Sequence, residues 1–436
     1  MNLEERRQAL IKLRQLLEKH SIDIQKDLKL DFGKPPFESE MTEVLSVIHE
    51  IDFFVPRLKK LISPRKVKTN WMNWPARSYI LAEPYGQVLV LGAWNYPINL
   101  CLVPAVGALA AGNSVVLKPS ELASHSSELL AQMINNNFHP DVLRVETGGV
   151  EVSQKLLTKK WDKIFFTGST RVGKLIYQAA AEQMTPVLLE LGGKSPAIFD
   201  TSCDWGISIK RLVWAKFFNA GQTCIAPDFV WVPKGNTQKF IELAKKEILA
   251  SDYQIENENY TQIINHQHWD RLVKLMNSGE IAYGGNSNRD LRFISPTLIT
   301  KVDWKDLIMQ EEIFGPLLPV LEYENLDQVT AQLKKFDKPL ALYLFAQSSE
   351  KFKWMEKWSF GGGAINEAVM QFSNPHLPFG GVGASGLGAY HGEESFWCFS
   401  HRKSLLAKPT WFEPPFKYGR LKEWHKSLIK WMMKLG

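Results

Sequence analysis

Cysteine is scarce in this 436-residue chain: four occur, at positions 101, 203, 224 and 398, without paired spacing or a CxxC motif. Neither a disulfide framework nor a zinc site is indicated, and we expect no metal at the functional site. No run of about 18 apolar residues occurs, so no transmembrane helix is predicted. The N-terminal stretch MNLEERRQALIKLRQ is charged and lacks the apolar core of an export signal. We therefore expect a reducing, cytoplasmic setting.

The apolar content, the charged content and the net charge of the chain are all ordinary. Apolar residues make up 45% and charged residues 22% of the chain, which is typical of a soluble globular protein. The net charge of +6 is modest and spread along the chain, so it gives no indication of nucleic-acid binding. Neither an internal repeat nor a low-complexity tract occurs. A chain of this length is too long for one ordinary core, and we expect two or three domains.

The N-terminal region predicts two helices, at residues 3–30 and 37–62, separated by two prolines. Residues 64–82 are aromatic, basic and β-prone, which indicates a protruding hairpin. Nucleic-acid binding is the alternative for such a stretch, and we favour a hairpin that forms an oligomer.

From residue 86 onward, apolar strands alternate with helices. Five such strands are predicted before residue 192, and the pattern restarts at about 193 and continues to about 390. Continuous apolar strands between helices predict parallel sheets covered on both faces, with ligands beyond the carboxyl ends of the strands. The expected fold is α/β, with two open parallel-sheet domains and a β-arm. The predicted segments are a first domain at 1–63 and 81–192, a hairpin at 64–80, a second domain at 193–392, a return segment at 393–415 and a tail at 416–436.

The stretch FNAGQTCIAPD at 218–228 follows an apolar helix and holds a thiol on a turn. Gly221 suits a helix stop, and Pro227 prevents a helix soon afterwards. The thiol of Cys224 can attack a carbonyl carbon if backbone N–H groups or a nearby cation lower its pKa. Taken alone, an inert core cysteine is the more common outcome, and we interpret the other three cysteines as structural.

Two further residues stand at strand ends. Glu190 ends an apolar strand, where loss of hydration would raise its pKa towards the range of a general base. The alternative for Glu190 is an edge position that faces solvent. Asn95 follows the first strand of the alternating region, where its amide can donate to a developing oxyanion or simply serve a turn.

Two short motifs suit a nucleotide. The segment from Gly168 to Gly173 joins a strand to a helix, where backbone N–H groups can bind phosphate, although it is not the G-x-G-x-x-G pattern. Lys118 and Glu121 follow another strand and can bond the two hydroxyls of a ribose. Ordinary turn glycines and an ordinary helix start are the alternatives for these two motifs.

Taken together, the motifs resemble those of the aldehyde dehydrogenases, in order and spacing over nearly the whole chain. They are AWNYP at 93–97, LKPSE at 117–121, FTGSTRVG at 166–173, LELGGKSP at 189–196, GQTC at 221–224, EEIFGP at 311–316 and LPFGGVG at 377–383. Other segments, such as SGLGAYHG at 385–392, resemble the class 3 branch, which includes fatty and aromatic aldehyde enzymes. The chain departs from many relatives at Ile313, often proline, and at Asn366-Glu367, often Asn-Asp. Neither change affects the expected chemistry.

The resemblance implies NAD(P)-dependent oxidation of an aldehyde to a carboxylic acid. Cys224 would be the nucleophile, Asn95 and the Cys224 N–H the oxyanion donors, and Glu190 the activator of water. Glu121 would favour NAD, because a carboxylate repels the 2′-phosphate of NADP, while use of both cofactors stays open. The cofactor-binding residues implied are Lys118, Glu121, Gly168, Ser169, Gly173, Leu191, Glu312 and Phe314. A CoA-acylating relative and a non-catalytic scaffold protein are the alternatives, and the presence of all three catalytic residues argues against them.

The tail alternates tryptophan and lysine at helical spacing. Its apolar stripe, Leu421, Trp424, Leu428, Trp431 and Leu435, is opposed by lysines at 422, 426, 430 and 434. Such a helix can lie on an anionic membrane, although packing against the same or a partner subunit is slightly favoured. The resemblance also implies a homodimer formed by the hairpin and the segment after residue 395.

Overall fold

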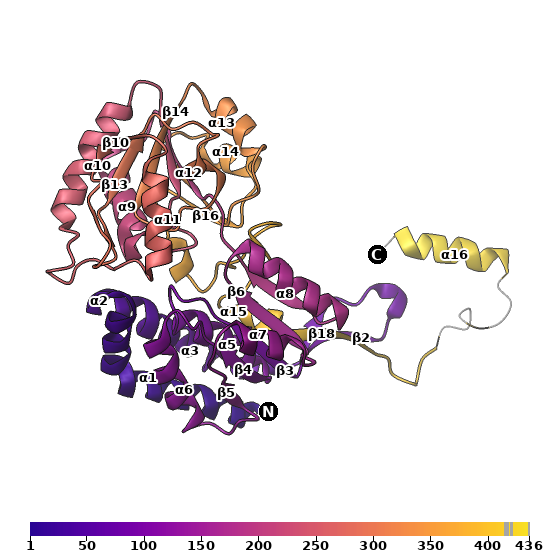
Figure 1. The fold of residues 1–436 in the computed structure, drawn as a ribbon. Helices are drawn as coiled ribbons and strands as arrows, with labels where there is room; N and C mark the ends of the chain where they lie inside the picture. The colour runs from indigo at the N-terminus through magenta and orange to yellow at the C-terminus, as the bar shows by residue number, and fades with distance from the viewer. Residues whose placement is uncertain (414–417, 419–421, 435–436) are drawn as a thin grey trace.

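The computed structural model describes residues 1–413, 418 and 422–434. The chain forms two lobes, each built on a mainly parallel sheet, and a projecting antiparallel sheet on one side (Figure 1). We call this projecting sheet, made of β1, β2 and β18, the arm sheet. The expected α/β class is therefore confirmed.

The first lobe carries a six-stranded sheet in the order β17-β7-β6-β3-β4-β5, in which only the β17 pairing is antiparallel. Its central strands are buried along almost their whole length, because helices cover both faces. The strands are β3 (Gln87–Leu91), β4 (Ser114–Lys118), β5 (Leu143–Val145), β6 (Lys163–Thr167), β7 (Val187–Glu190) and β17 (Gly386–Leu387), and the helices between them are α5 (Asn99–Ala111), α6 (Ser124–Asn135), α7 (Val150–Leu157) and α8 (Thr170–Glu182).

The N-terminal helices pack onto this lobe, α1 against α6 and α3 against α5. The single helix predicted at 37–62 is wrong, because the segment divides into four pieces. Pro56, which has no N–H to continue the helical bonding, lies in the break between α3 and α4. The first helix is α1 (Leu3–Phe32), and the four pieces are α2 (Pro36–Ser39), the π-helical η1 (Glu40–Leu45), α3 (Ser46–Phe54) and α4 (Leu58–Ile62).

The second lobe carries a seven-stranded sheet in the order β10-β13-β14-β9-β8-β15-β16, parallel except at β10. The strand-like run ISPTLI at 294–299 is interrupted before Pro296, so that β12 and β13 belong to different sheets. The strands are β8 (Pro196–Phe199), β9 (Phe229–Pro233), β10 (Glu280–Tyr283), β13 (Thr297–Thr300), β14 (Leu317–Tyr323), β15 (Ala341–Phe345) and β16 (Gly362–Ile365), with a separate pair β11 (Ser287–Asn288) and β12 (Phe293–Ile294). The helices are α9 (Trp205–Phe217), α10 (Thr237–Ser251), α11 (His266–Met276), α12 (Leu307–Gln310), α13 (Leu326–Leu333) and α14 (Lys351–Lys357).

The arm sheet joins distant parts of the chain. Its strands are β1 (Arg65–Val67), β2 (Arg77–Pro84) and β18 (Ser400–Ala407), with the 3-10 turn η2 (Trp71–Asn73) between the first two. β18 follows α15 (Glu393–Cys398) and pairs with β2 along its whole length, from Ser400 opposite Pro84 to Ala407 opposite Arg77. The predicted segment boundary at 80/81 thus falls inside β2, since pairing with β18 extends that strand.

The tail forms helix α16 (Glu423–Lys434), which lies beyond the arm sheet at the far side of the molecule (Figure 1). Its Trp431 packs edge-on against Trp71 of the arm, with ring centroids 6.3 Å apart. Leu421 and Leu435 of the predicted stripe lie outside the described residues. Within the described part of the chain, no helix combines the length and apolar character needed to cross a bilayer.

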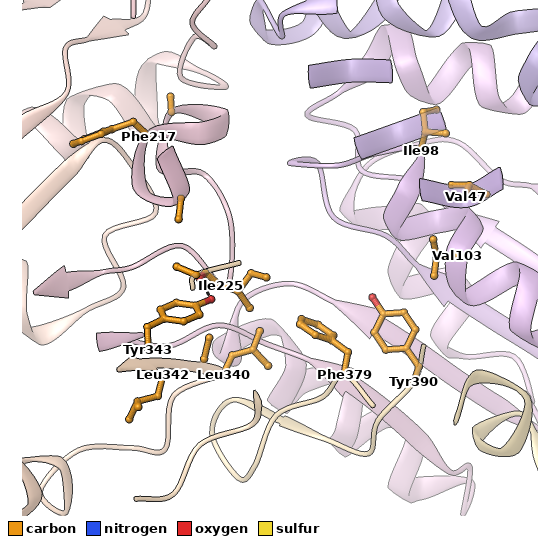
Figure 2. Close-up of a cluster of buried hydrophobic side chains, with 14 of the residues drawn as sticks. Val47, Ile98, Val103, Phe217, Ile225, Leu340, Leu342, Tyr343, Phe379 and Tyr390 are labelled. Carbon is orange, nitrogen blue, oxygen red and sulfur yellow. Dashed lines mark hydrogen bonds between the residues drawn. The ribbon is translucent and has the colours of Figure 1, made fainter. Parts of the chain in front are cut away.

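A buried apolar cluster connects the two lobes. Figure 2 shows Val47, Ile98 and Val103 from the first lobe on one side and Ile225 and Tyr343 from the second lobe on the other. Phe379 and Tyr390 lie between them, with ring centroids 5.8 Å apart. The residue after Cys224 is thus part of the core where the lobes meet.

Candidate active site

Cys224 lies on a turn that reverses the chain after α9. Asn219, Ala220 and Gly221 all have left-handed backbone angles, with φ of 51°, 50° and 71°. A side chain at Gly221 would collide with the carbonyl oxygen of Gly315, so this position requires glycine. The structure thereby confirms the turn that the sequence predicts, and the three left-handed residues explain why it is so sharp.

Buried hydrogen bonds hold this turn on both sides of the cysteine. The fully buried Gln222 donates to the carbonyl oxygen of Gln262 (3.0 Å) and accepts from the N–H of Ile264 (3.0 Å). After the cysteine, the Tyr343 hydroxyl donates to the carbonyl oxygen of Ile225 (2.6 Å), and it points towards that residue in Figure 2. The cysteine is therefore fixed by contacts to its neighbours on both sides.

The surroundings of Cys224 favour the neutral thiol. Burial raises its pKa well above the ordinary value, and the charges of Glu312 and Glu190 act in the same direction. The N–H groups of Cys224 and Ile225 lower the pKa only in part. The N–H groups that could lower this pKa are therefore outweighed by burial and by the nearby carboxylates. A base that accepts the thiol proton is needed for attack.

Asn95 lies beside the cysteine turn. Its side-chain amide is buried and donates to the carbonyl oxygen of Gln222 at 3.0 Å. In return, the amide of Asn219 donates to the carbonyl oxygens of both Asn95 and Gln222, each at 3.1 Å. The turn after β3 and the cysteine turn are thus bonded together although they come from different lobes.

Glu190 and Thr167 end the neighbouring strands β7 and β6 and lie opposite each other in the sheet. Both oxygens of the buried Glu190 carboxyl, and the hydroxyl of Thr167, lack a hydrogen-bond partner. Burial raises the pKa of Glu190 well above its ordinary value. The alternative of a solvent-facing edge is therefore wrong. Unpartnered buried polar groups are rare, so these oxygens indicate a place for water or a ligand.

The predicted ribose-binding pair forms a direct contact. The buried ammonium of Lys118 donates to Glu121 at 2.7 Å. Burial alone would raise the pKa of Glu121, but the hydrogen bond and charge of Lys118 lower it overall. The pair leaves the second carboxylate oxygen of Glu121 available on a side chain that is partly exposed.

The predicted phosphate turn opens α8. Ser169 caps this helix by accepting from the N–H of Val172 (3.4 Å), and the N–H of Gly168 donates to the carbonyl oxygen of Glu190 (3.0 Å). An added Cβ at Gly173 would lie 2.7 Å from Leu191, so glycine allows the first turn of α8 to approach the strand end closely. The helix N-terminus and the Glu190 strand end are therefore adjacent.

Glu312 and Phe314 come from the second lobe. The Glu312 carboxyl lies directly against the backbone of Gly192, where an added Cβ would overlap it. Burial raises the pKa of Glu312 to about 8, helped by the charge of Asp228 and opposed by the N–H of Gly193. Phe314 packs edge-on against Trp94 with ring centroids 5.4 Å apart. All predicted site residues except the Lys118–Glu121 pair and the α8 turn thus lie near the junction of the lobes.

Three residues that sequence reasoning missed hold the segment containing Glu312. The ammonium of Lys194 donates to Asp228 and to the carbonyl oxygens of Ile308 (2.7 Å) and Glu311 (2.9 Å). The other oxygen of Asp228 accepts from the N–H of Ile313 at 2.8 Å. Arg271 donates to the carbonyl oxygen of Ile313 at 2.6 Å. Lys194 and Asp228 lie within stretches that the sequence analysis singled out, but no spacing indicates that they meet.

Comparison with known proteins decides what this arrangement is. Residues 1–405 match the model of the aldehyde dehydrogenase family. The chain is 41% identical over 428 residues to 4,4'-diaponeurosporen-aldehyde dehydrogenase of Staphylococcus aureus, covering 96% of this chain and 93% of that protein. It is 40% identical over 408 residues to aldehyde dehydrogenase family 3 member A2 of Rattus norvegicus, covering 92% of this chain and 84% of that protein. The chain belongs to the aldehyde dehydrogenase family.

A solved structure extends this match to the fold. The substrate-bound state of Staphylococcus aureus AldH superimposes with a TM-score of 0.94 at 40% identity, covering 99% of this chain and 95% of that chain. The resemblance to the family and to its class 3 branch is therefore confirmed, and the protein is an NAD(P)-dependent aldehyde dehydrogenase.

The residues present fit the cofactor of this dehydrogenase. The partnerless Glu190 and Thr167 oxygens lie at the carboxyl ends of parallel strands, next to the N-terminus of α8. This is where nucleotides bind in open α/β sheets. Within the described ranges, no group of histidine, cysteine and acidic side chains could hold a metal ion.

Proposed function

We propose that Cys224 is the nucleophile of this aldehyde dehydrogenase. Its sulfur attacks the aldehyde carbon and forms a thiohemiacetal. The Asn95 amide and the Cys224 N–H donate to the oxygen that becomes negative in this step. Because its surroundings keep the thiol neutral, the thiol proton has to pass to solvent water as the sulfur attacks, and Glu190 stays unprotonated for the later step with water.

Bound NAD(P) would supply the acceptor for the hydride that leaves this carbon. The product on the enzyme is a thioester, with the acyl carbon still bonded to the sulfur of Cys224. Glu190 then takes a proton from water, whose oxygen attacks the acyl carbon. The carbon–sulfur bond breaks, the carboxylic acid leaves and the thiol is restored.

The observation that carries this proposal is the buried, partnerless carboxyl of Glu190, which lies close enough to Cys224 for its charge to raise the thiol pKa. A carboxyl with a raised pKa is a competent base near neutral pH, and the raised pKa of Glu190 has burial as its cause. A carboxyl with no such role would be expected to have hydrogen-bond partners at this depth.

The test separates the two halves of the reaction. Cys224→Ser should abolish NADH formation. Glu190→Gln should still form the thioester, giving a burst of about one NADH per active site, followed by turnover at least about 100-fold slower. The exposed Glu182→Gln on α8 is the matched control and should behave like the wild type. Normal steady-state turnover in Glu190→Gln would refute the role of Glu190.

For the cofactor, we propose that Lys118 and Glu121 bind the adenosine ribose and that Gly168, Ser169 and Gly173 form the pyrophosphate turn. Leu191, Glu312 and Phe314 would then surround the nicotinamide end. In this proposal residues 1–63 and 81–192 form the cofactor-binding domain and residues 193–392 the catalytic domain. The adjacency of the α8 N-terminus and the Glu190 strand end supports it.

For the substrate, we propose an apolar aldehyde, medium- or long-chain aliphatic or aromatic. Apolar side chains occur on both sides of the nucleophile in the sequence: Ile225 is buried, and Phe218 packs against Trp214 with tilted rings at a centroid distance of 5.0 Å. The name of the Staphylococcus relative, which acts on 4,4'-diaponeurosporen-aldehyde, supports the same class. Rates for a series of aldehydes should rise with chain length.

We also propose a homodimer formed by residues 64–80 and 393–415, and contact of the tail with an anionic membrane surface. The dimer is supported by the long strand β18, which lies at the edge of the arm sheet. The membrane contact is supported by the exposed Trp424 and Trp431 on a lysine-rich helix.

A further inference from the structure

A buried ion pair lies next to the catalytic turn but outside the proposed chemistry. Lys34, just after the end of α1, is fully buried and donates to Glu43 at 2.7 Å. The other oxygen of Glu43 accepts from the N–H groups of Ile98 (3.1 Å) and Asn99 (3.0 Å), at the start of α5. A carboxylate at this position stabilises the helix that begins directly after the Asn95 turn.

The ammonium of Lys34 also lies over the ring of Tyr96, 3.9 Å from its centroid. At this distance a buried cation is attracted to the face of the ring. The hydroxyl of Tyr96 in turn forms a 2.6 Å hydrogen bond with the hydroxyl of Thr223, the residue before Cys224. One continuous set of contacts therefore runs from the end of α1 to the nucleophile.

A second set of contacts leads from the same helix end to the same turn. The carbonyl oxygen of Phe32 accepts from the N–H of Gln262 at 2.8 Å. The carbonyl oxygen of Gln262 accepts from the side chain of Gln222 at 3.0 Å. The two routes thus meet the catalytic turn at the two residues that directly precede the cysteine.

We propose that the C-terminal end of α1 holds the catalytic turn in its reactive geometry, with Lys34 as a positioning residue that acts through Tyr96 and Thr223. Lys34 belongs to the first lobe and Cys224 to the second, so the contact also sets the nucleophile relative to the sheet that ends in Glu190. For attack, the aldehyde carbon must lie within about 3.5 Å of the Cys224 sulfur and within a narrow range of angles. Small movements of the turn therefore slow the reaction. This inference rests on Cys224 being the nucleophile.

The experiment removes single hydroxyls, because these changes leave the buried ion pair intact. Tyr96→Phe and Thr223→Val should each slow the NADH burst about 10-fold and slow the reaction of Cys224 with iodoacetamide to a similar extent. The KM for NAD should be unchanged. The double variant should be no slower than either single variant, since both remove one hydrogen bond. Thr223→Ser, which keeps the hydroxyl, should restore the wild-type rates.

The matched control is Tyr323→Phe. Tyr323 is also buried and donates through its hydroxyl to a backbone carbonyl, that of Phe199 (2.7 Å), away from the catalytic turn. This variant should lose a similar amount of thermal stability and keep its burst rate. The double variant Lys34→Met with Glu43→Gln removes both charges of the ion pair and so tests the role of the cation. Its NADH burst should slow as much as that of Tyr96→Phe.

Wild-type burst and alkylation rates in Tyr96→Phe and Thr223→Val would overturn the proposal, as would additive effects in the double variant. Failure of the assigned nucleophile would look different: iodoacetamide would modify another cysteine, and Cys224→Ser would remain active. Peptide mass spectrometry of the alkylated protein distinguishes the two results.

Discussion

Gly192 shows how a single missing side chain shapes the site. The carboxyl of Glu312 occupies the space that a Cβ at this position would take. It comes there from another lobe, held by the contacts of Lys194, Asp228 and Arg271 to its segment. Glycine at 192 is therefore needed for the approach of Glu312 rather than for an unusual backbone angle.

We expect Gly192→Ala to weaken cofactor binding. The methyl group has to displace the Glu312 carboxyl, and overpacking of this kind costs about 1–3 kcal/mol. If Glu312 contacts the cofactor, the KM for NAD should rise about 10-fold, with a smaller effect on the KM for the aldehyde. Steady-state kinetics with each substrate varied in turn measure both constants.

Gly362→Ala is the control for this substitution. Gly362 lies on β16, and no heavy atom lies within 4 Å of a Cβ added there. Its kinetics should match those of the wild type. An unchanged KM for NAD in Gly192→Ala would show that Glu312 does not contribute to cofactor binding.

At this scale the motifs predicted which residues lie close together better than the surroundings of those residues. The positions of Cys224, Glu190 and Asn95 around one junction agree with the sequence analysis. The raised pKa of Cys224 could not be predicted, because it depends on burial and on the charges of Glu312 and Glu190, which are distant in sequence. The local sequence around Cys224 does not indicate how close Glu312 and Glu190 come to it in space.

Among the helices, α3 and α15 are joined by a buried acid. The Glu50 carboxyl of α3 accepts from the N–H of Gly392, the residue that precedes α15, at 2.9 Å. Its second oxygen is 3.9 Å from Nδ1 of His391 and lacks a hydrogen-bond partner. Burial raises the pKa of Glu50 to about 7, opposed by the Gly392 N–H and Ser395, and burial lowers that of His391 to about 4. Both groups are therefore neutral slightly above pH 5.

This contact predicts a pH dependence of stability. Since the pKa of Glu50 is higher in the folded protein than in the unfolded chain, the folded state holds its proton more tightly. The stability gained from this is complete below the unfolded pKa of about 4.5 and is lost as the pH rises through about 7. Between about pH 5.5 and about pH 8, the wild type should lose about 2 kcal/mol more than Glu50→Gln.

Thermal unfolding of both proteins across this pH range measures the difference. The exposed Glu356→Gln on α14 should follow the wild type at every pH. Parallel curves for wild type and Glu50→Gln would show that Glu50 keeps an ordinary pKa. His391 is present in both proteins, so its own titration cancels in the comparison.

The sequence predicted the elements of this region only in part. Apolar periodicity identified helical structure at 37–62, but the break before α4 and the π-helical turn of η1 depend on local backbone chemistry that periodicity does not report. The carboxyls of Glu43 and Glu50 are fully buried, although charged residues in amphipathic helices usually face solvent. Their partners, Lys34 and Gly392, come from other segments, so no pattern within the helix indicates the burial.

In the whole molecule, the arm sheet and the tail stand apart from the two lobes (Figure 1). Among the described residues, β18 is an edge strand that pairs only with β2, and all its residues after Ser400 are exposed, including Leu405 and Leu406. A long exposed edge with apolar side chains favours pairing with another chain. The proposed dimer would cover this edge.

We therefore expect the double substitution Leu405→Lys with Leu406→Lys to convert a dimer into monomers. Charges on an edge strand prevent pairing between chains. Light scattering after size exclusion should give about twice the chain mass of 49.8 kDa for the wild type and a single chain mass for the variant. Leu249→Lys, on the exposed face of α10, is the control and should leave the mass unchanged. A monomeric wild type would contradict the proposed dimer.

The proposed contact of the tail helix α16 with an anionic membrane can be tested by removing the tail. Truncation after residue 413 should leave the dimer intact and abolish sedimentation with anionic vesicles, because it removes a helix with exposed Trp424 and Trp431 and three lysines. Binding of the full chain should weaken with salt and be absent with neutral vesicles, since each lysine near an anionic surface contributes about 1 kcal/mol. Lys426→Glu with Lys430→Glu in the full chain should have the effect of the truncation while keeping the tryptophans. If the truncated and full-length proteins sediment equally, the membrane contact is excluded, and the packing of Trp431 against Trp71 of the arm is left as the function of this helix.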